Sequence, residues 1–271
     1  KMNAVVVHVR PFGDAMYPSE YFPWSKYISG TQGKDPGFDP LKYMVKAAHD
    51  RGLAFHAWIN PYRVTSDTTD VTTLSKDNMA RKWLTNKSDK DDRNVLAFGG
   101  ALYYNPSDNW VQAQIRYGIE EIVKNYDVDG IHFDDYFYPS LGSDYKENFD
   151  AEEYKEYDTW CKENGVKVKS IADWRRDNVN RLVRKTYQDI KEINPAVEFG
   201  ISPGGFLDIL QKDDQYYTDI RTWLSEPGYL DYICPQLYWS FSSKEYPYDK
   251  TLDRWLELRT NEDVKMYVGI A

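Results

Sequence analysis

Short apolar runs rich in β-branched residues alternate along the chain with longer stretches whose apolar positions recur at helical spacing. This alternation is typical of a mostly parallel β-sheet with helices between its strands. The runs that predict strands are residues 3–10, 53–60, 128–135, 197–202, 230–238 and 265–270. The stretches that predict helices are residues 40–51, 76–87, 109–125, 150–164, 173–193, 216–224 and 250–260. A charged turn is expected over 89–94 and a small hairpin over 95–104.

The six predicted strands are two short of the closed eight of a (β/α)8 barrel. The strand at 3–10 has no strand–helix unit before it and the one at 265–270 has none after it, and the two absent strands would be neighbours in a closed barrel. We therefore predict an α/β fold, a (β/α)8 TIM-type barrel in a single domain over residues 1–271, lacking its first and last strand units here and so a fragment of a longer chain. The alternative is an open doubly wound sheet, but no glycine-rich phosphate-binding turn follows any strand. The longest connections, from which a barrel enzyme would build a cleft, are residues 11–39, 61–75 and 136–149.

Polar and aromatic residues gather at the carboxyl ends of the predicted strands. Because alternate side chains of a barrel strand face inward, residues two apart share a face. Five strands carry such residues on what we expect to be a common inner face: His8 and Arg10; His56, Trp58 and Asn60; His132 and Asp134; Gly200 and Ser202; Gln236 and Tyr238. For any one of them, a hydrogen-bonded polar group of the barrel core is an equal alternative. The same pattern on five strands favours a site, because buried polar groups need partners and seldom accumulate without use.

The most informative segment is residues 128–139, an apolar strand that ends abruptly in Asp134 and Asp135. Ionised carboxylates destabilise the end of a buried strand unless they have partners, and catalytic residues of barrel enzymes lie at this end of the strands. Glycoside hydrolysis needs a proton donor and a carboxylate that stabilises or attacks the sugar cation. We predict Asp134 as the first essential carboxylate. Asp135 points the opposite way in an ideal strand, so it either turns inward where the strand ends or orients a neighbour. A helix cap or a structural cation site is the alternative for both.

Composition narrows the class of partner. The chain has 34 basic and 43 acidic residues and a formal net charge of −9, which argues against nucleic acid or an anionic membrane surface as partner. Its 23 Tyr, 11 Phe and 9 Trp suit a cleft that stacks on sugar rings, although a Tyr-rich core and surface would give the same counts. The two cysteines, Cys161 in a polar helical stretch and Cys234 in a strand, provide no disulfide framework or metal spacing. No stretch is long and apolar enough to be a transmembrane segment, and no signal peptide is visible.

Several motifs resemble a known family, the bacterial glycosyl hydrolase-like 10 family. They are Val9-Arg10-Pro11-Phe12-Gly13-Asp14-Ala15, Pro23-Trp24-Ser25, Asp39-Pro40-Leu41, Ala48-His49-Asp50-Arg51-Gly52-Leu53, His56-Ala57-Trp58-Ile59-Asn60-Pro61-Tyr62-Arg63 and Asp129-Gly130-Ile131-His132-Phe133-Asp134-Asp135-Tyr136. The resemblance implies a TIM-barrel hydrolase that is exported from the cytoplasm, often as a lipoprotein. It also implies action on peptidoglycan glycan strands, including strands stripped of their stem peptides. Family members normally begin with one more strand and helix, in line with the strand count.

A second similarity concerns mechanism. Family-18 chitinases carry an Asp-Gly-x-Asp-x-Asp-x-Glu strand and a later Met-x-Tyr strand, and residues 129–136 and 236–238 are similar to these. Asp134 matches the aspartate that orients the substrate acetamide, whereas Tyr136 occupies the position of the catalytic glutamate. The similarity therefore implies a substrate-assisted route in which Tyr238 and Asp134 hold the acetamide. The proton donor would be Asp135 or a residue that the sequence does not identify, and the product would keep its anomeric configuration.

The remaining candidates are supporting residues. Arg10 either pairs with Asp14 or binds the lactyl carboxylate of a muramic acid through bidentate hydrogen bonds. His56 and Asn60 are candidates for bonds to sugar hydroxyls. The candidates for stacking on a sugar ring, each of which would equally suit packing under a loop, are Trp24, Tyr62, Tyr104, Tyr136 and Trp239.

Two other chemistries find no support in the sequence. Ser202-Pro203-Gly204-Gly205 is not a Gly-x-Ser-x-Gly nucleophile elbow, so no serine-hydrolase triad is suggested. The histidines lack metal-ligand spacing such as His-Glu-x-x-His, so we expect neither a catalytic metal nor a cofactor.

The sequence thus predicts a glycoside hydrolase that acts outside the cytoplasm on peptidoglycan or a related amino-sugar polysaccharide. Such a protein would be periplasmic, secreted or held at the cell surface, with any lipid anchor on a segment absent from this sequence. One alternative is a non-catalytic glycan-binding barrel that has lost a catalytic group. Another is a hydrolase of a different exopolysaccharide, such as an α-linked galactosaminoglycan.

Overall fold

The computed structural model describes residues 2–271, which divide into two compact units. The first unit runs to His132 and includes Asp189–Val197, and the second comprises Phe133–Gln188 and Glu198–Ala271. Six strands are hydrogen-bonded in the order β1-β2-β5-β6-β7-β8, and β5 contributes residues to both units. They are β1 (Ala4–Arg10), β2 (Ala54–Ile59), β5 (Gly130–Phe133), β6 (Glu198–Ile201), β7 (Tyr232–Ile233) and β8 (Lys265–Met266). This order confirms the predicted α/β fold with six of the strands of a TIM-type barrel.

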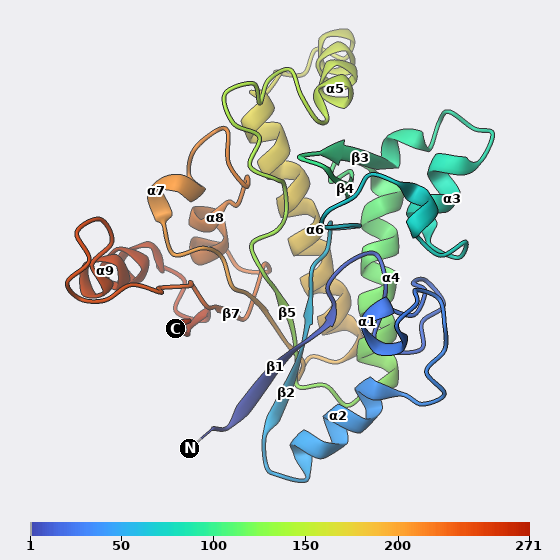
Figure 1. The fold of residues 1–271 in the computed structure, drawn as a ribbon. Helices are drawn as coiled ribbons and strands as arrows, with labels where there is room; N and C mark the ends of the chain where they lie inside the picture. Colours follow the sequence, from blue (N-terminus) through green and yellow to red (C-terminus); the bar gives the residue numbers. More distant parts are fainter. Residues whose placement is uncertain (1) are drawn as a thin grey trace. The chain divides into compact units, whose positions relative to one another are not determined.

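In the first unit, β1 and β2 pair in parallel, with Ala4 opposite Ala54 and His8 opposite Trp58 (Figure 1). A separate antiparallel hairpin joins β3 (Val95–Phe98) to β4 (Ala101–Tyr104), as the sequence predicts. The helices of this unit are α1 (Lys26–Ser29), α2 (Pro40–His49), α3 (Met79–Thr85) and α4 (Asn109–Asn125), with short 3-10 turns at η1 (Val71–Thr73) and η2 (Asp92–Asn94).

Local chemistry explains why these helices begin where they do. The Asp39 side chain accepts a hydrogen bond from the Lys42 backbone N–H, and Pro40 occupies the first helical position of α2. Asp108 caps α4 in the same way through the Val111 N–H at 2.8 Å. The buried face of α4 is apolar at a helical period and includes Val111, Ile115, Ile119 and Ile122.

The second unit contains β6, β7 and β8 and the helices α5 (Ala151–Glu163), α7 (Leu207–Leu210), α8 (Ile220–Ser225) and α9 (Tyr248–Leu258). The long helix α6 (Ile171–Ile193) begins in this unit and ends in the first. The strand predicted over 230–238 is only two residues of regular ladder, and the one predicted over 265–270 is equally short. Single bridges from Gln236 to Gly204 and to Gly269 continue the pairing past these ladders.

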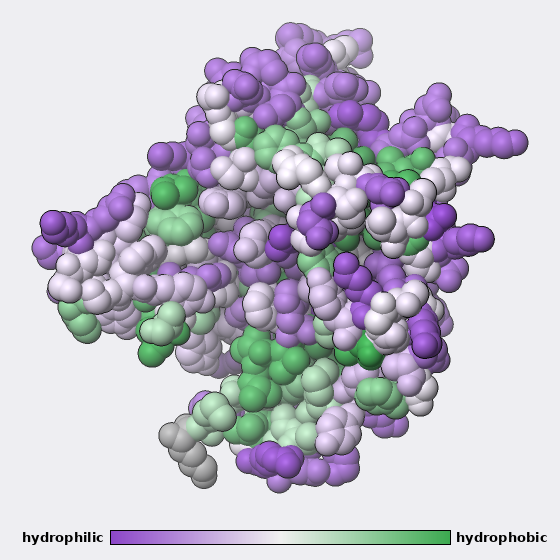
Figure 2. Space-filling view, viewed as in Figure 1, coloured by the Kyte–Doolittle hydropathy of each residue, from purple (hydrophilic) through white to green (hydrophobic). Residues whose placement is uncertain are grey.

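The space-filling view shows an apolar surface over β1 and β2 (Figure 2). Val6 is 47% exposed there, at the outer strand of the hydrogen-bonded order. In a closed barrel an additional strand would cover such an edge. Among the described residues, no helix is long and apolar enough to cross a membrane, and both cysteines are free.

Candidate active site

In the first unit, three predicted side chains lie together on one face of neighbouring strands. His8 of β1 stacks on Trp58 of β2 with ring centroids 4.0 Å apart, and Trp58 meets the edge of His132 of β5 at 6.2 Å. His56 packs directly over Gly130, where an added Cβ would lie 2.5 Å from its Nδ1 atom. The predicted common face is therefore confirmed for His8, His56, Trp58 and His132.

His8 and His132 are neutral at physiological pH. Burial, with a smaller contribution from His56 and His8, lowers the pKa of His132 to about 3. Burial and the Arg63 charge lower the pKa of His8 to about 4. Neither imidazole is therefore a proton donor near neutral pH, and both are suited to hydrogen bonding rather than acid catalysis.

Arg10 does not share the face of His8. The β1–β2 register shifts between these two residues, so Arg10 leaves the alternation of an ideal strand. Its guanidinium lies 4.2 Å from the centroid of the Phe22 ring and against Gly118 of α4, and the residue is 1% exposed. The register shift thus turns Arg10 into the core, and the binding of a substrate carboxylate by Arg10 stays a prediction.

Asp14 is also a structural group in this unit. It is buried, accepts a hydrogen bond from Gln32 Nε2 at 3.0 Å, and forms no ion pair with Arg10 in the described chain. Burial raises the pKa of Asp14, and its hydrogen bond from Gln32 opposes that rise. The predicted Arg10–Asp14 pair is therefore absent, and Asp14 holds the connection that follows β1.

Three further candidates lie in the core rather than at an open surface. Asn60 is 1% exposed and its Oδ1 accepts the Arg63 N–H at 3.3 Å, a bond that shapes the turn after β2. Tyr62 and Tyr104 are fully or almost fully buried, and the Tyr104 N–H donates to the Tyr62 carbonyl at 2.8 Å. The burial of these two rings favours packing in the core, the alternative to stacking on a sugar.

The second unit contains the acidic pair. Asp134 is 2% exposed, and its Oδ1 accepts a hydrogen bond from the Tyr136 N–H at 3.2 Å. Asp135 is half-buried and Tyr136 is exposed. Burial raises the pKa of Tyr238, and the nearby charges of Cys234 and Asp135 raise it further. Burial also raises the pKa of Tyr216, to which the Asp135 charge again adds. Of these two tyrosines, Tyr238 is 54% exposed.

Tyr216 is a member of this group that the sequence does not reveal. Tyr216 and Tyr217 adopt φ angles of 28° and 56°, a region that non-glycine residues rarely occupy. Such strain is frequent at functional sites, where surrounding contacts hold it. In the sequence these two tyrosines begin the helix predicted over 216–224. In the structure residues 216–219 instead form a loop before α8.

Ser202 and Gln236 hold the strand ends of this unit together. The Ser202 N–H donates to the Phe133 carbonyl, and its hydroxyl donates to the Cys234 carbonyl, both at 2.8 Å. Gln236 Nε2 donates to the Ser202 carbonyl at 2.9 Å. Both side chains thus donate hydrogen bonds to backbone carbonyls near Asp134 and Asp135, which favours a role in positioning these strand ends.

Trp239 belongs to an aromatic group after β7. Its ring centroid lies 4.8 Å from that of Tyr246 and 6.2 Å from that of Phe206. Gly205 permits this packing, because an added Cβ would lie 2.6 Å from the Trp239 ring. In residues 2–271, no group of three or more His, Cys, Asp or Glu side chains is arranged to hold a metal ion.

Comparison with known proteins shows which family the chain belongs to. The profile of the family described as Glycosyl hydrolase-like 10 matches residues 1–271. The chain belongs to the glycosyl hydrolase-like 10 family. It is 43% identical over 288 residues to glycosyl hydrolase YngK of Bacillus subtilis (strain 168), covering 100% of this chain and 52% of that protein. It is 38% identical over 294 residues to glycosyl hydrolase DigH of Escherichia coli (strain K12), covering 100% of this chain and 62% of that protein.

This member of the glycosyl hydrolase-like 10 family spans between half and two thirds of those relatives. Its fold is similar to the PgaB (BpsB) glycoside hydrolase domain from Bordetella bronchiseptica, with a TM-score of 0.60 and 12% identity. That likeness covers 98% of this chain and 74% of the other. At this level of identity it supports the barrel fold alone.

Proposed function

We propose that this chain carries the catalytic site of a glycoside hydrolase, with Asp135 as the proton donor and Asp134 as its partner carboxylate. The observation that carries the proposal is the place of Asp135, which lies half-buried just after the end of β5. A carboxylate that donates a proton must reach the leaving oxygen, which suits the more accessible Asp135. The more buried Asp134 suits a fixed role in orienting the substrate.

For the substrate, we propose an N-acetylated amino-sugar glycan, either peptidoglycan strands or a related polysaccharide. The support is the similarity of residues 129–136 to the chitinase strand, in which the position of Asp134 orients an acetamide. In the substrate-assisted route, Asp134 and Tyr238 hold the acetamide while its oxygen attacks the anomeric carbon. The glycosidic bond breaks, its oxygen takes the proton of Asp135, and water then opens the oxazolinium ion with return of a proton to Asp135. This route requires a product of unchanged anomeric configuration, so NMR detection of inversion would rule it out. Such a substrate implies a location outside the cytoplasm.

The decisive assay is the release of glycan fragments from amidase-treated peptidoglycan by the purified protein. We expect Asp135→Asn to lower the rate at least 100-fold, since general acid catalysis contributes roughly 10²–10⁴-fold, and Asp134→Asn to lower it as well. Asp144→Asn is the matched control, because Asp144 is an exposed aspartate on the connection after β5. Circular dichroism establishes that each variant is folded.

The assay also separates the alternatives. Glycan binding without release by the wild-type protein would favour a non-catalytic glycan-binding barrel. Release from an α-linked galactosaminoglycan, but not from peptidoglycan, would replace the proposed substrate with that exopolysaccharide. Full activity of both Asp134→Asn and Asp135→Asn would place the catalytic carboxylates elsewhere.

A further inference from the structure

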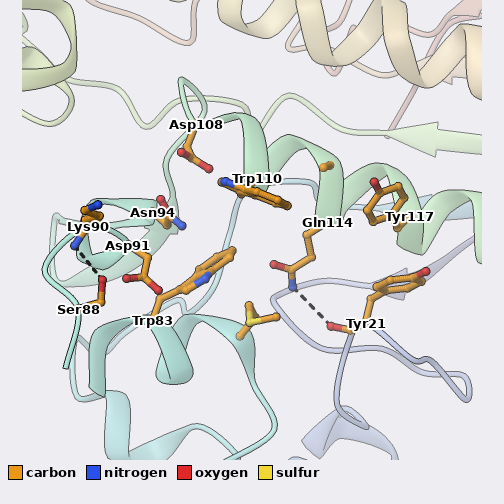
Figure 3. Close-up of a pocket in the computed structure, with 12 residues that line it drawn as sticks. Tyr21, Trp83, Ser88, Lys90, Asp91, Asn94, Asp108, Trp110, Gln114 and Tyr117 are labelled. Atoms are coloured by element: carbon orange, nitrogen blue, oxygen red, sulfur yellow. Dashed lines mark hydrogen bonds between the residues drawn. The ribbon is translucent and has the colours of Figure 1, made fainter. Parts of the chain in front are cut away.

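A pocket lies wholly within the first unit and shares no residue with the proposed catalytic site. It is bounded by the connection before α1, by α3 and the segment from α3 to η2, and by the first half of α4 (Figure 3). Its volume of about 580 Å³ is within the range of small-molecule sites, about 300–1,000 Å³. The residues that carry the argument are Tyr21, Trp83, Asp91, Trp110, Gln114 and Tyr117.

Two aromatic residues that line the pocket are exposed to solvent. Trp110 is 75% exposed at the beginning of α4, and Tyr117, further along the same helix, is 44% exposed. Figure 3 shows the indole of Trp110, on α4, above that of Trp83, on α3, among the residues that line the pocket. Exposed indoles on a rigid helix bring large contact area to a partner at a small loss of conformational entropy.

Neighbouring rings hold the pocket in shape without a ligand. Trp83 packs edge-on against the buried Tyr104, with ring centroids 6.1 Å apart and an interplanar angle of 82°. Tyr21 and Tyr117 contact each other with centroids 5.5 Å apart. The aromatic surface is thus already formed, which lowers the free energy required to order it on binding.

The pocket also contains an unused hydrogen-bond acceptor. Gln114 is 8% exposed, and its Nε2 donates to the Tyr21 carbonyl at 3.4 Å. Its Oε1 has no hydrogen-bond partner among the described residues, and Figure 3 shows this oxygen directed into the pocket, away from Tyr21. A buried acceptor without a donor destabilises the free protein. A ligand that brings an O–H or N–H group would satisfy it.

The charge of the lining selects the ligand further. Asp91 and Asp108 line the pocket with Lys90 as its one cation, so the lining favours neutral over anionic ligands. A hydrogen bond from the Ser88 side chain and another from Asn86 lower the pKa of Asp91, which is therefore ionised at neutral pH. Asp91 Oδ2 accepts a hydrogen bond from Asn86 Nδ2 at 2.8 Å. Phosphorylated or carboxylated ligands would be repelled here.

We propose that this pocket is an accessory binding site for a neutral pyranose unit of a polysaccharide. The apolar face of the sugar ring would pack between Trp83 and Trp110, while its hydroxyls would donate to Gln114 and Asp91. A glycan held here and at a second site on the same molecule would bind more tightly than through either alone. The inference rests on the pocket itself and stands whether or not Asp135 is catalytic.

The test is a titration of the protein with the tetramer of N-acetylglucosamine, followed by NMR of the tryptophan indole N–H groups. We expect the Trp83 and Trp110 signals, assigned with Trp83→Phe and Trp110→Phe, to shift on addition of the tetramer. Trp110→Ala should weaken the binding that the Trp83 signal reports at least fivefold. Gln114→Met, which keeps the shape but removes the acceptor, should weaken it as well. Trp160→Ala is the control, because Trp160 is 54% exposed on α5 in the other unit.

The outcomes separate this proposal from the catalytic one. Asp135→Asn should leave the Trp83 and Trp110 shifts unchanged even if it abolishes glycan release. No shift of either signal with the tetramer or with cellotetraose would overturn the proposal. Shifts caused by an aromatic or cationic peptide, and by neither sugar, would overturn it in favour of a peptide site. Unchanged affinity in both Trp110→Ala and Gln114→Met would also overturn it.

Discussion

Arg175 is a buried cation whose contacts shape the loop beside Asp135. Its Nε donates to Asp150 Oδ1 at 2.7 Å, and its Nη1 donates to the Tyr217 hydroxyl at 2.8 Å. Tyr138 donates its hydroxyl to the second oxygen of Asp150 at 2.7 Å. Tyr217 directly follows Tyr216, so this network holds the strained backbone that places Tyr216 near Asp135. A single buried guanidinium thus connects core stability to the proposed site.

Replacement of Arg175 by Met should therefore destabilise the protein by about 3–5 kcal/mol, because it leaves the Asp150 carboxylate buried without its counter-charge. Burial already raises the pKa of Asp150 against the opposing effect of Arg175. Urea unfolding measures the change. Arg254→Met is the control, since its pair with Asp208 is exposed and should contribute less than about 1 kcal/mol. Adding Asp150→Asn should recover part of the loss, and no recovery would count against an uncompensated charge as the cause.

Helix α4 contains a glycine that suits its packing neighbours better than it suits the helix itself. Gly118 lies in the middle of this helix, where glycine is less favourable than alanine by about 1 kcal/mol. An added Cβ would lie 2.5 Å from both Arg10 Nη1 and the Phe22 ring. The glycine therefore permits β1 and the following connection to approach α4 closely.

For Gly118→Ala, the two effects oppose each other. Helix propensity predicts a gain of about 1 kcal/mol, whereas overpacking of a buried contact typically destabilises by about 1–3 kcal/mol. Both crowded groups are themselves buried, so they cannot move into solvent, and we expect a net loss of stability. Thermal unfolding decides the sign. A variant more stable than the wild type would show that Arg10 and Phe22 shift easily.

The free energy of unfolding depends on pH through all titratable groups of the molecule, among them the buried His8 and His132. The pKa values of His132 and His8 are lowered from 6.5 to about 3 and about 4 in the folded state. Between the unfolded and folded values the unfolded chain binds more protons, so the free energy of unfolding falls as pH falls. The contribution of both histidines is complete above about pH 6.5 and is lost progressively toward about pH 4.

Replacement of both His8 and His132 by Gln should therefore flatten the fall in unfolding free energy between pH 6.5 and pH 4, the window bounded by the lowered pKa of His8. Urea midpoints across this range measure the slope, and comparison with the wild type removes the contribution of the acidic groups common to both proteins. The sign of the difference matters more than absolute stability, which the substitutions also change. An identical slope in the two proteins would mean that the folded histidines titrate normally.

At the scale of the whole molecule, the sequence determined the order and kind of the main elements. The six strand runs, the hairpin and the acidic end of β5 all have local signals, namely apolar runs, turn residues and two adjacent aspartates. Alternation along the strands also placed His8, Trp58 and His132 on one face, because a regular strand repeats every two residues. These properties depend on residues close together in the chain.

Tertiary structure decided the rest. Arg10 turns into the core because a bulge breaks the alternation of β1, which no local pattern announces. Tyr62 and Tyr104 are buried, while Trp110 is exposed, because exposure depends on which distant segment covers a ring. The strained backbone at Tyr216 and Tyr217 is held by Arg175, which bonds the Tyr217 hydroxyl and is distant from it in the chain. The sequence thus specified which chemical groups the protein has, and long-range packing decided which of them remain open to a ligand.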